Sequence, residues 1–131
     1  MKVLFDYNMP PKMARALNEF VESDGHRALA LREKFPTNIS DVEYFSALGR
    51  ERDWIVFSKD LSNHKRPPER QAIMSSGVLA FYLSRALQKK GPHEQLAVIL
   101  WQWERLIQRR RDTRNGMFQL PENKGSQFKT L

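Results

Sequence analysis

The sequence contains no cysteine among its 131 residues. Disulfide bonds, thiolate catalysis and zinc sites built on cysteine are therefore excluded. No apolar run approaches the roughly 18 residues that a membrane-spanning helix requires. The amino-terminal segment has only a short apolar stretch before its first carboxylate, which is not the form of a signal peptide, and we therefore expect a cytoplasmic protein.

Common nucleotide-binding motifs are also missing. The chain has neither a G-x-x-x-x-G-K-[ST] loop nor a G-x-G-x-x-G loop, so a nucleotide cofactor is not supported. Its histidines, His26, His64 and His93, are widely spaced and are interpreted as surface residues rather than zinc ligands. The length is typical of one domain, which we predict over residues 1–121, followed by a flexible carboxyl-terminal tail over residues 122–131.

Positive charge is abundant and unevenly placed. The formal net charge is +7, from 22 lysines and arginines against 15 aspartates and glutamates. Residues 1–63 hold 9 basic and 10 acidic side chains, whereas residues 64–131 hold 13 basic and 5 acidic ones. A near-neutral half joined to a basic half suits an enzyme that acts on a phosphodiester, because acids hold cations and bases hold the substrate backbone. The same asymmetry is also typical of a solvated basic surface that aids solubility.

Short apolar runs alternate with helical patterns along the chain. The apolar runs predict five strands, over residues 3–5, 28–31, 54–57, 78–83 and 117–120. Helical spacing predicts shorter helices and one long amphipathic helix, namely those beginning at Pro11, Asp41 and Pro67 and the one over residues 96–107. This order predicts an α/β fold, a three-layer α/β/α sandwich around a central, mostly parallel five-stranded sheet.

Carboxylates follow two of the predicted strands. Asp6 comes directly after the first strand, and Asp60 comes shortly after the third. Asp41 and Glu43 lie in the first turn of the helix that leads into the third strand. Because ligands of open α/β sheets bind beyond the carboxyl ends of the strands, these acids are expected to converge on one edge of the sheet.

Converging carboxylates repel one another, since two unit charges about 4 Å apart cost on the order of 4 kcal/mol at an effective dielectric of about 20. A hard dication relieves this repulsion, and all-oxygen ligation suits Mg²⁺ or Mn²⁺. Such an ion activates water and stabilises charge on a phosphoryl oxygen. The acids and the basic half of the chain together therefore predict metal-assisted hydrolysis of a phosphodiester.

Each acid also has a purely structural interpretation. Asp6 could turn the chain after its strand, and Asp60 could cap the segment that follows. Glu43 could be the capping-box partner of Ser40, and Asp41 could complement the helix dipole. The joint pattern favours a site more strongly than any one of these acids does.

Arginines gather at the end of the last predicted helix. Arg109, Arg110, Arg111 and Arg114 either form a phosphate-binding stretch or a solvated helix end that the helix dipole favours. The basic charge of this half of the chain favours nucleic-acid contact over the solvated helix end. Lys59, next to one of the acids, joins the expected RNA-binding residues, although it could also be an ordinary loop residue.

Three short motifs resemble the PIN-like superfamily, in particular the compact branch associated with VapC-type toxins of toxin–antitoxin systems. They are DYNMP at residues 6–10, SDVEY at residues 40–44 and WIVFSKD at residues 54–60. Their order and spacing fit, and the resemblance extends over essentially the whole chain. It implies a ribonuclease that depends on Mg²⁺ or Mn²⁺.

The resemblance also implies roles for individual residues. Asp6 and Asp60 would be the central metal-binding carboxylates, and Asp41, Glu43 or both would supply the acid on the intervening helix. Polar neighbours would orient carboxylates, water or phosphate, namely Ser58 and Asn8. The resemblance further implies a homodimer and a co-encoded protein antitoxin that blocks the site.

One departure from the family pattern favours an alternative. Many PIN nucleases have a fourth acid beyond the next strand, but here residues 78–83 are followed by Ser-Arg-Ala-Leu with no carboxylate. A catalytically degenerate module that only binds RNA or protein therefore stays open. A phosphotransfer or phosphatase domain that uses Asp6 or Asp60 as a nucleophile ranks third, because the first loop lacks the second aspartate of a D-x-D pair.

Overall fold

A computed structural model describes the backbone of all 131 residues and the side chains of all except Asn63 and His64. The interpretation of His64 as a surface residue therefore lies outside the described side chains. None of the described helices is both long and apolar enough to cross a membrane.

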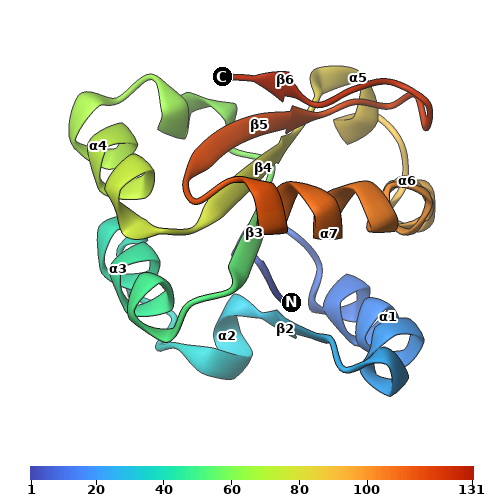
Figure 1. Cartoon of the computed structure of the whole chain (residues 1–131), viewed down its shortest axis with the longest axis horizontal. Coiled ribbons are helices and arrows are strands. Elements are labelled where there is room, and N and C mark those ends of the chain that lie inside the picture. Colours follow the sequence, from blue (N-terminus) through green and yellow to red (C-terminus); the bar gives the residue numbers. More distant parts are fainter.

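A six-stranded sheet in the order β2-β1-β3-β4-β5-β6 forms the centre of the molecule (Figure 1). The first five strands pair in parallel, whereas β6 pairs antiparallel with β5. The strands are β1 (Lys2–Phe5), β2 (Arg27–Ala30), β3 (Trp54–Ser58), β4 (Leu79–Leu83), β5 (Gly116–Leu120) and β6 (Lys129–Thr130). The predicted α/β architecture is confirmed, with one strand more than expected.

Helices cover both faces of this sheet. The α-helices are α1 (Pro11–Val21), α2 (Leu31–Lys34), α3 (Asp41–Glu51), α4 (Pro67–Ser76), α5 (Arg85–Gln88), α6 (Pro92–Trp101) and α7 (Trp103–Asp112). Two short 3₁₀ helices are η1 (Glu22–Asp24) and η2 (Leu61–His64). One core cluster joins the sheet to α1, α6 and α7, and a second joins it to α3 and α4. The fold is therefore a three-layer sandwich.

A row of phenylalanines crosses the sheet on the face that α1, α6 and α7 cover. On neighbouring strands, Phe5 lies opposite Phe57, Phe57 opposite Phe81 and Phe81 opposite Phe118. The centroids of consecutive rings are 5.4, 5.9 and 5.3 Å apart. Aromatic pairs across neighbouring strands stabilise a sheet beyond their buried area. This row fixes the register of the four central strands, and with it the positions of the residues that follow each strand.

The prediction of one long helix over residues 96–107 is wrong, because this part of the chain forms two helices, α6 and α7, on either side of Gln102. The Gln102 side chain is fully buried, and its amide donates to the backbone oxygen of Ser126 at 3.1 Å. The amphipathic pattern continues through the break, since Trp103 and Leu106 are still buried. The boundary therefore coincides with a buried contact distant in the sequence, while backbone hydrogen bonds still run from Gln102 to Val98 and from Leu106 to Gln102.

The last ten residues also differ from expectation. Residues 122–131 were expected to form a flexible tail, but the segment ends in β6 and buries Phe128 to 9% exposure. The Phe128 ring lies 5.0 Å from the Phe81 ring in an edge-on contact. The difference arises because one residue, Phe128, anchors the segment to the core. The composition of the segment is otherwise polar, so composition alone predicts a flexible tail.

Candidate active site

Asp6 is a buried carboxylate at the carboxyl end of β1. Its side chain is 6% exposed. Its Oδ1 accepts a hydrogen bond from the backbone N–H of Tyr7 at 2.7 Å, and its Oδ2 accepts one from the hydroxyl of Ser58 at 2.8 Å. Burying a carboxylate is costly unless hydrogen-bond donors satisfy its oxygens. Asp6 is therefore held in a defined position by its own loop and by β3.

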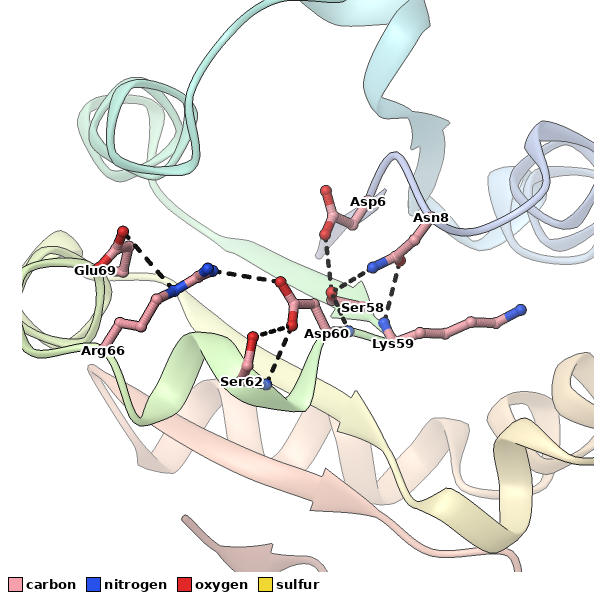
Figure 2. Close-up of polar contacts among 8 residues, drawn as sticks. All are labelled: Asp6, Asn8, Ser58, Lys59, Asp60, Ser62, Arg66 and Glu69. Carbon is pink, nitrogen blue, oxygen red and sulfur yellow. Dashed lines mark hydrogen bonds and ion pairs between the residues drawn. The ribbon is translucent and has the colours of Figure 1, made fainter.

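The Ser58 hydroxyl connects the loops that follow β1 and β3. Besides donating to Asp6, its oxygen accepts from the backbone N–H of Asp60 at 3.1 Å and from the amide of Asn8 at 3.4 Å (Figure 2). Asn8 in turn accepts from the backbone N–H of Lys59 at 3.1 Å. Both polar neighbours expected from the sequence, Asn8 and Ser58, therefore lie beside Asp6.

The Asp60 carboxylate faces the segment that leads into α4. Its Oδ1 accepts from the backbone N–H of Ser62 at 3.1 Å, which caps η2, and also from the Ser62 hydroxyl. Its Oδ2 forms an ion pair with Arg66 at 3.4 Å, and Arg66 also reaches Glu69 at 3.8 Å. Figure 2 shows that the carboxylates of Asp6 and Asp60 do not point toward one another. The cap suggested for Asp60 by the sequence is thus present in the structure.

The two acids at the start of α3 have different surroundings. Glu43 is exposed, and Ser40 caps the helix: its hydroxyl accepts from the Glu43 N–H at 3.2 Å and donates to Glu43 Oε1 at 2.9 Å, so the carboxylate contacts the side chain of Ser40. Asp41 is half-buried, and its charge acts on the hydroxyl of Tyr44 in the next turn. Of these two acids, Asp41 therefore shares its environment with the buried part of the site.

Tyr44 brings α3 into contact with Asp6. Its hydroxyl is buried and has no partner with good hydrogen-bond geometry among the described side chains. Burial raises its pKa well above the ordinary value, and the nearby negative charges of Asp6 and Asp41 raise it further. The hydroxyl therefore stays protonated at neutral pH, and as a neutral donor it lies next to the carboxylates from β1 and α3.

Sequence reasoning missed Tyr44, and it also missed the exposed ring of Tyr7. Tyr44 follows Asp41 by three residues, a spacing that places both on one helical face and was the available signal. The Tyr7 ring is 54% exposed beside Asp6, and the guanidinium of Arg32 lies 4.5 Å from its centroid. Arg32 follows the carboxyl end of β2, which pairs in parallel with β1, so the two residues meet at the same edge of the sheet although they are far apart in the sequence.

The basic residues expected to bind RNA lie in two separate regions. Lys59 is at the same edge of the sheet as Asp6, and its side chain extends away from Asp60 in Figure 2. The arginine cluster expected beyond the last helix lies at the opposite edge, because α7 leads into the amino end of β5. It consists of Arg109, Arg110, Arg111 and Arg114. The structure therefore does not bring these four arginines to the carboxylates.

Two of these arginines have structural contacts of their own. Arg110 donates to the backbone oxygens of Trp54 at 2.7 Å and Gly77 at 3.2 Å, and to two further oxygens just after α7. Burial lowers its pKa, although its guanidinium stays charged. Arg109 lies 4.7 Å from the centroid of the Phe118 ring. Arg110 in particular holds the amino ends of the strands together.

The donor chemistry near Asp6 fits a hard dication. The groups around Asp6 that could face an ion offer oxygen atoms, namely those of Asp6, Ser58, Asn8 and Tyr44, and oxygen is the ligand type that Mg²⁺ and Mn²⁺ prefer. Among the described side chains, no three acidic or imidazole groups are already arranged to hold a metal ion. Mg²⁺ commonly binds through one or two carboxylates together with waters and substrate phosphates. The residues therefore suit an ion held by few protein ligands.

Comparison with known families agrees with this architecture. A family model described as "PIN like domain" matches residues 1–85, well over half of the chain. The chain belongs to the PIN-like family. Neither the curated proteins nor the solved structures gave a match. The PIN-like match ends within α5, so it includes β1 to β4 and all four candidate acids, while α6, α7, β5 and β6 lie beyond it.

Proposed function

We propose that this PIN-like protein is a metal-dependent endoribonuclease that hydrolyses RNA phosphodiester bonds. One observation carries the proposal: the buried carboxylate of Asp6 lies at the carboxyl edge of the sheet, where Ser58 of β3 and Tyr44 of α3 both approach it. PIN-like domains are often nucleases and commonly use divalent metals. A buried acid bounded by three elements at this edge is what such chemistry requires.

Asp6 is the residue proposed to hold Mg²⁺ or Mn²⁺ most directly. Asp60 and Asp41 are the further ligands, with Asp60 exchanging its Arg66 ion pair for the ion. Glu43 stays an alternative to Asp41, but its exposure and its bonds with Ser40 favour Asp41. A bound dication would activate water and stabilise negative charge on the phosphoryl oxygen.

The residues around Asp6 have proposed roles that do not involve a metal ion. Ser58 fixes the orientation of Asp6, and Asn8 holds the two loops together. The exposed Tyr7 ring offers a face on which a nucleobase can stack next to the reacting phosphate, a contact worth about 1–3 kcal/mol per base in single-stranded recognition. Lys59 supplies a positive charge for the RNA backbone at the same edge.

A biological role as the toxin of a type II toxin–antitoxin system is the finer part of the proposal. It rests on the VapC-type resemblance of the three motifs and on the net charge of +7, which favours a polyanionic substrate. The proposal includes a cytoplasmic location, a homodimer and a co-encoded antitoxin. Expression should arrest growth, and co-expression of the adjacent gene's product should restore it. If the protein cleaves RNA in vitro but its expression leaves growth unaffected, the toxin role is wrong and the proposed nuclease activity stands.

The test is cleavage of a mixed RNA pool with Mg²⁺, with Mn²⁺ or with EDTA. We expect cleavage only with metal, and its loss in Asp6→Ala/Asp60→Ala. The control is Glu19→Ala/Asp24→Ala, which removes two exposed carboxylates from the end of the molecule opposite the site. Equal cleavage by the parent and the Asp6→Ala/Asp60→Ala variant, with folding intact in both, would refute the proposal.

A catalytically degenerate binding module is the alternative. The observation that favours it is the segment after β4, where Ser84 caps α5 and Arg85 follows without any carboxylate. The absence of a ready three-acid group among the described side chains agrees with it. Salt-sensitive RNA binding without cleavage under any metal condition would establish this alternative.

A further inference from the structure

A polar cavity lies at the edge of the sheet opposite to Asp6. It has a volume of about 660 Å³, which is within the range of small-molecule sites. The turns before β3, β4 and β5 contribute Arg52 and Asp53, Gly77, and Arg114 with Asn115. Its position at the amino ends of the strands separates it from the carboxylates by the full length of the sheet.

Positive charge dominates the lining of this cavity. Arg52, Arg110 and Arg114 face it, against the single carboxylate of Asp53. That carboxylate already lies 3.2 Å from the amino-terminal ammonium group. Among the described side chains no carboxylate pairs with Arg52 or Arg114. Like charges that share a cavity repel, and a bound anion is what relieves that repulsion.

The polar groups in the cavity are of two kinds: some are already bonded within the protein, and others are available to a ligand. Arg110 is of the first kind, because backbone oxygens at the ends of three segments accept from its guanidinium. Asn115 accepts from the Gly77 N–H at 2.6 Å, which fixes its oxygen and leaves its amide nitrogen as a donor. Arg52 and Arg114 are exposed and carry unoccupied guanidinium donors. Such donors suit the oxygens of a phosphate group.

The backbone at Arg52, the residue at which α3 ends, is strained. Its φ of 69° and ψ of 160° lie in a region that is essentially restricted to glycine. Asp53 follows with a φ of 65°, so two consecutive residues other than glycine are left-handed. Strained residues of this kind cluster at ligand-binding sites. A glycine would relax this turn but would remove the guanidinium from the cavity.

We propose that this cavity is a second, non-catalytic site that binds a phosphate group through Arg52, Arg114 and the amide of Asn115. The phosphate belongs either to a small phosphorylated compound or to the backbone of an RNA that passes around the molecule. The site does not depend on the metal-dependent cleavage proposed above, because none of its residues lies at the carboxyl edge.

The test uses inorganic pyrophosphate, titrated in the presence of EDTA so that metal binding at Asp6 does not contribute. Calorimetry should detect binding to the parent protein, and Arg52→Gln/Arg114→Gln should weaken it at least about tenfold, as the loss of charge-assisted hydrogen bonds implies. Arg15→Gln/Arg27→Gln is the matched control, since both side chains are exposed and lie outside the cavity. Equal weakening in both double variants would overturn the proposal, because it would reduce the effect to net charge.

A single variant separates binding from folding. Arg52→Gly should keep or raise the melting temperature, since it removes the strained backbone, yet it should lose most of the pyrophosphate affinity. Pyrophosphate affinity unchanged in Arg52→Gly would refute the role of the guanidinium.

A competition experiment then identifies the source of the phosphate. Displacement of pyrophosphate by a short single-stranded RNA, in the parent but not in Arg52→Gln/Arg114→Gln, supports an RNA backbone. Retention of pyrophosphate in the presence of RNA supports a small phosphorylated compound. Failure of the parent to bind pyrophosphate at all would overturn the site, whatever the outcome of the cleavage experiments.

Discussion

At the scale of single residues, one hydroxyl organises the carboxyl edge of the sheet. Ser58 is 2% exposed and contacts Asp6, Asn8 and the backbone of Asp60 through a single oxygen atom. These partners lie 50 or more residues away in the sequence, except Asp60. Residues that orient a metal ligand typically affect metal affinity and activity by about 10–100-fold.

Ser58→Ala should therefore lower cleavage by at least about tenfold and raise the Mn²⁺ concentration needed for half-maximal cleavage. The buried Asp6 carboxylate loses a donor, so the free energy of unfolding should fall by about 1.5–3 kcal/mol. Single-turnover cleavage against Mn²⁺ concentration and urea unfolding measure the two effects. Ser46→Ala, at an exposed serine of α3, should change neither by more than a small factor. If Ser58→Ala needs the same Mn²⁺ concentration as the parent, Ser58 does not orient a metal ligand and only stabilises the fold.

The sequence was most informative about these residues and least informative about their orientation. It predicted that Asp6, Asp60 and the acids of α3 would follow strands or open a helix, and each does. The alternative interpretation of Glu43 as the partner of Ser40 is supported in part, because the Ser40 hydroxyl bonds both the N–H and the carboxylate of Glu43. The Asp60 carboxylate is turned by two contacts: the cap on Ser62, which the sequence suggested, and the ion pair with Arg66, which no sequence pattern predicts.

At the scale of elements, continuous apolar strands were predicted well because each is buried on both faces. β3 and β4 are buried at every position, so their runs of apolar residues are unambiguous. The boundary between α6 and α7 was missed because Gln102 fits an amphipathic helix, and its buried contact is with a residue 24 positions away. Strand β6 was missed because two residues are too short for a pattern.

Phe128 tests whether the carboxyl-terminal segment is an integral element. The ring packs edge-on against Phe81 and lies 5.5 Å from the guanidinium of Arg109. Phe128→Ala should therefore reduce the free energy of unfolding by about 3–5 kcal/mol, the usual cost of truncating a buried phenylalanine, and hydrogen exchange should accelerate in β5. Phe20→Ala is the control, since that ring is 63% exposed. A cost below about 0.5 kcal/mol for Phe128→Ala would restore the flexible tail that composition alone predicts.

At the scale of the whole molecule, charge is divided between two ends of one sheet. Carboxylates gather beyond the carboxyl ends of the strands, and the arginines after α7 gather near the amino ends. The sequence predicted acids that hold a cation and a basic half that holds the substrate backbone, and it did not place the two regions relative to each other. The doubly covered parallel sheet separates them, because a helix that leads into a parallel strand must end at the amino edge. Binding to RNA and cleavage of RNA are therefore expected to be separable.

RNA binding without metal should survive the loss of the acids. In EDTA, Asp6→Ala/Asp60→Ala should bind single-stranded RNA at least as tightly as the parent, because two negative charges no longer repel the phosphates. The slope of log K against log salt concentration should stay the same, since the basic contacts remain. Lys59→Gln/Arg85→Gln, which removes two cations from the carboxyl edge, should make the slope shallower by about 1.4, given about 0.7 per phosphate contact on single strands. Filter binding across a salt series measures both. If the loss of the acids weakens RNA binding tenfold in a folded protein, the carboxylates themselves hold the RNA, and the separation of binding from cleavage is wrong.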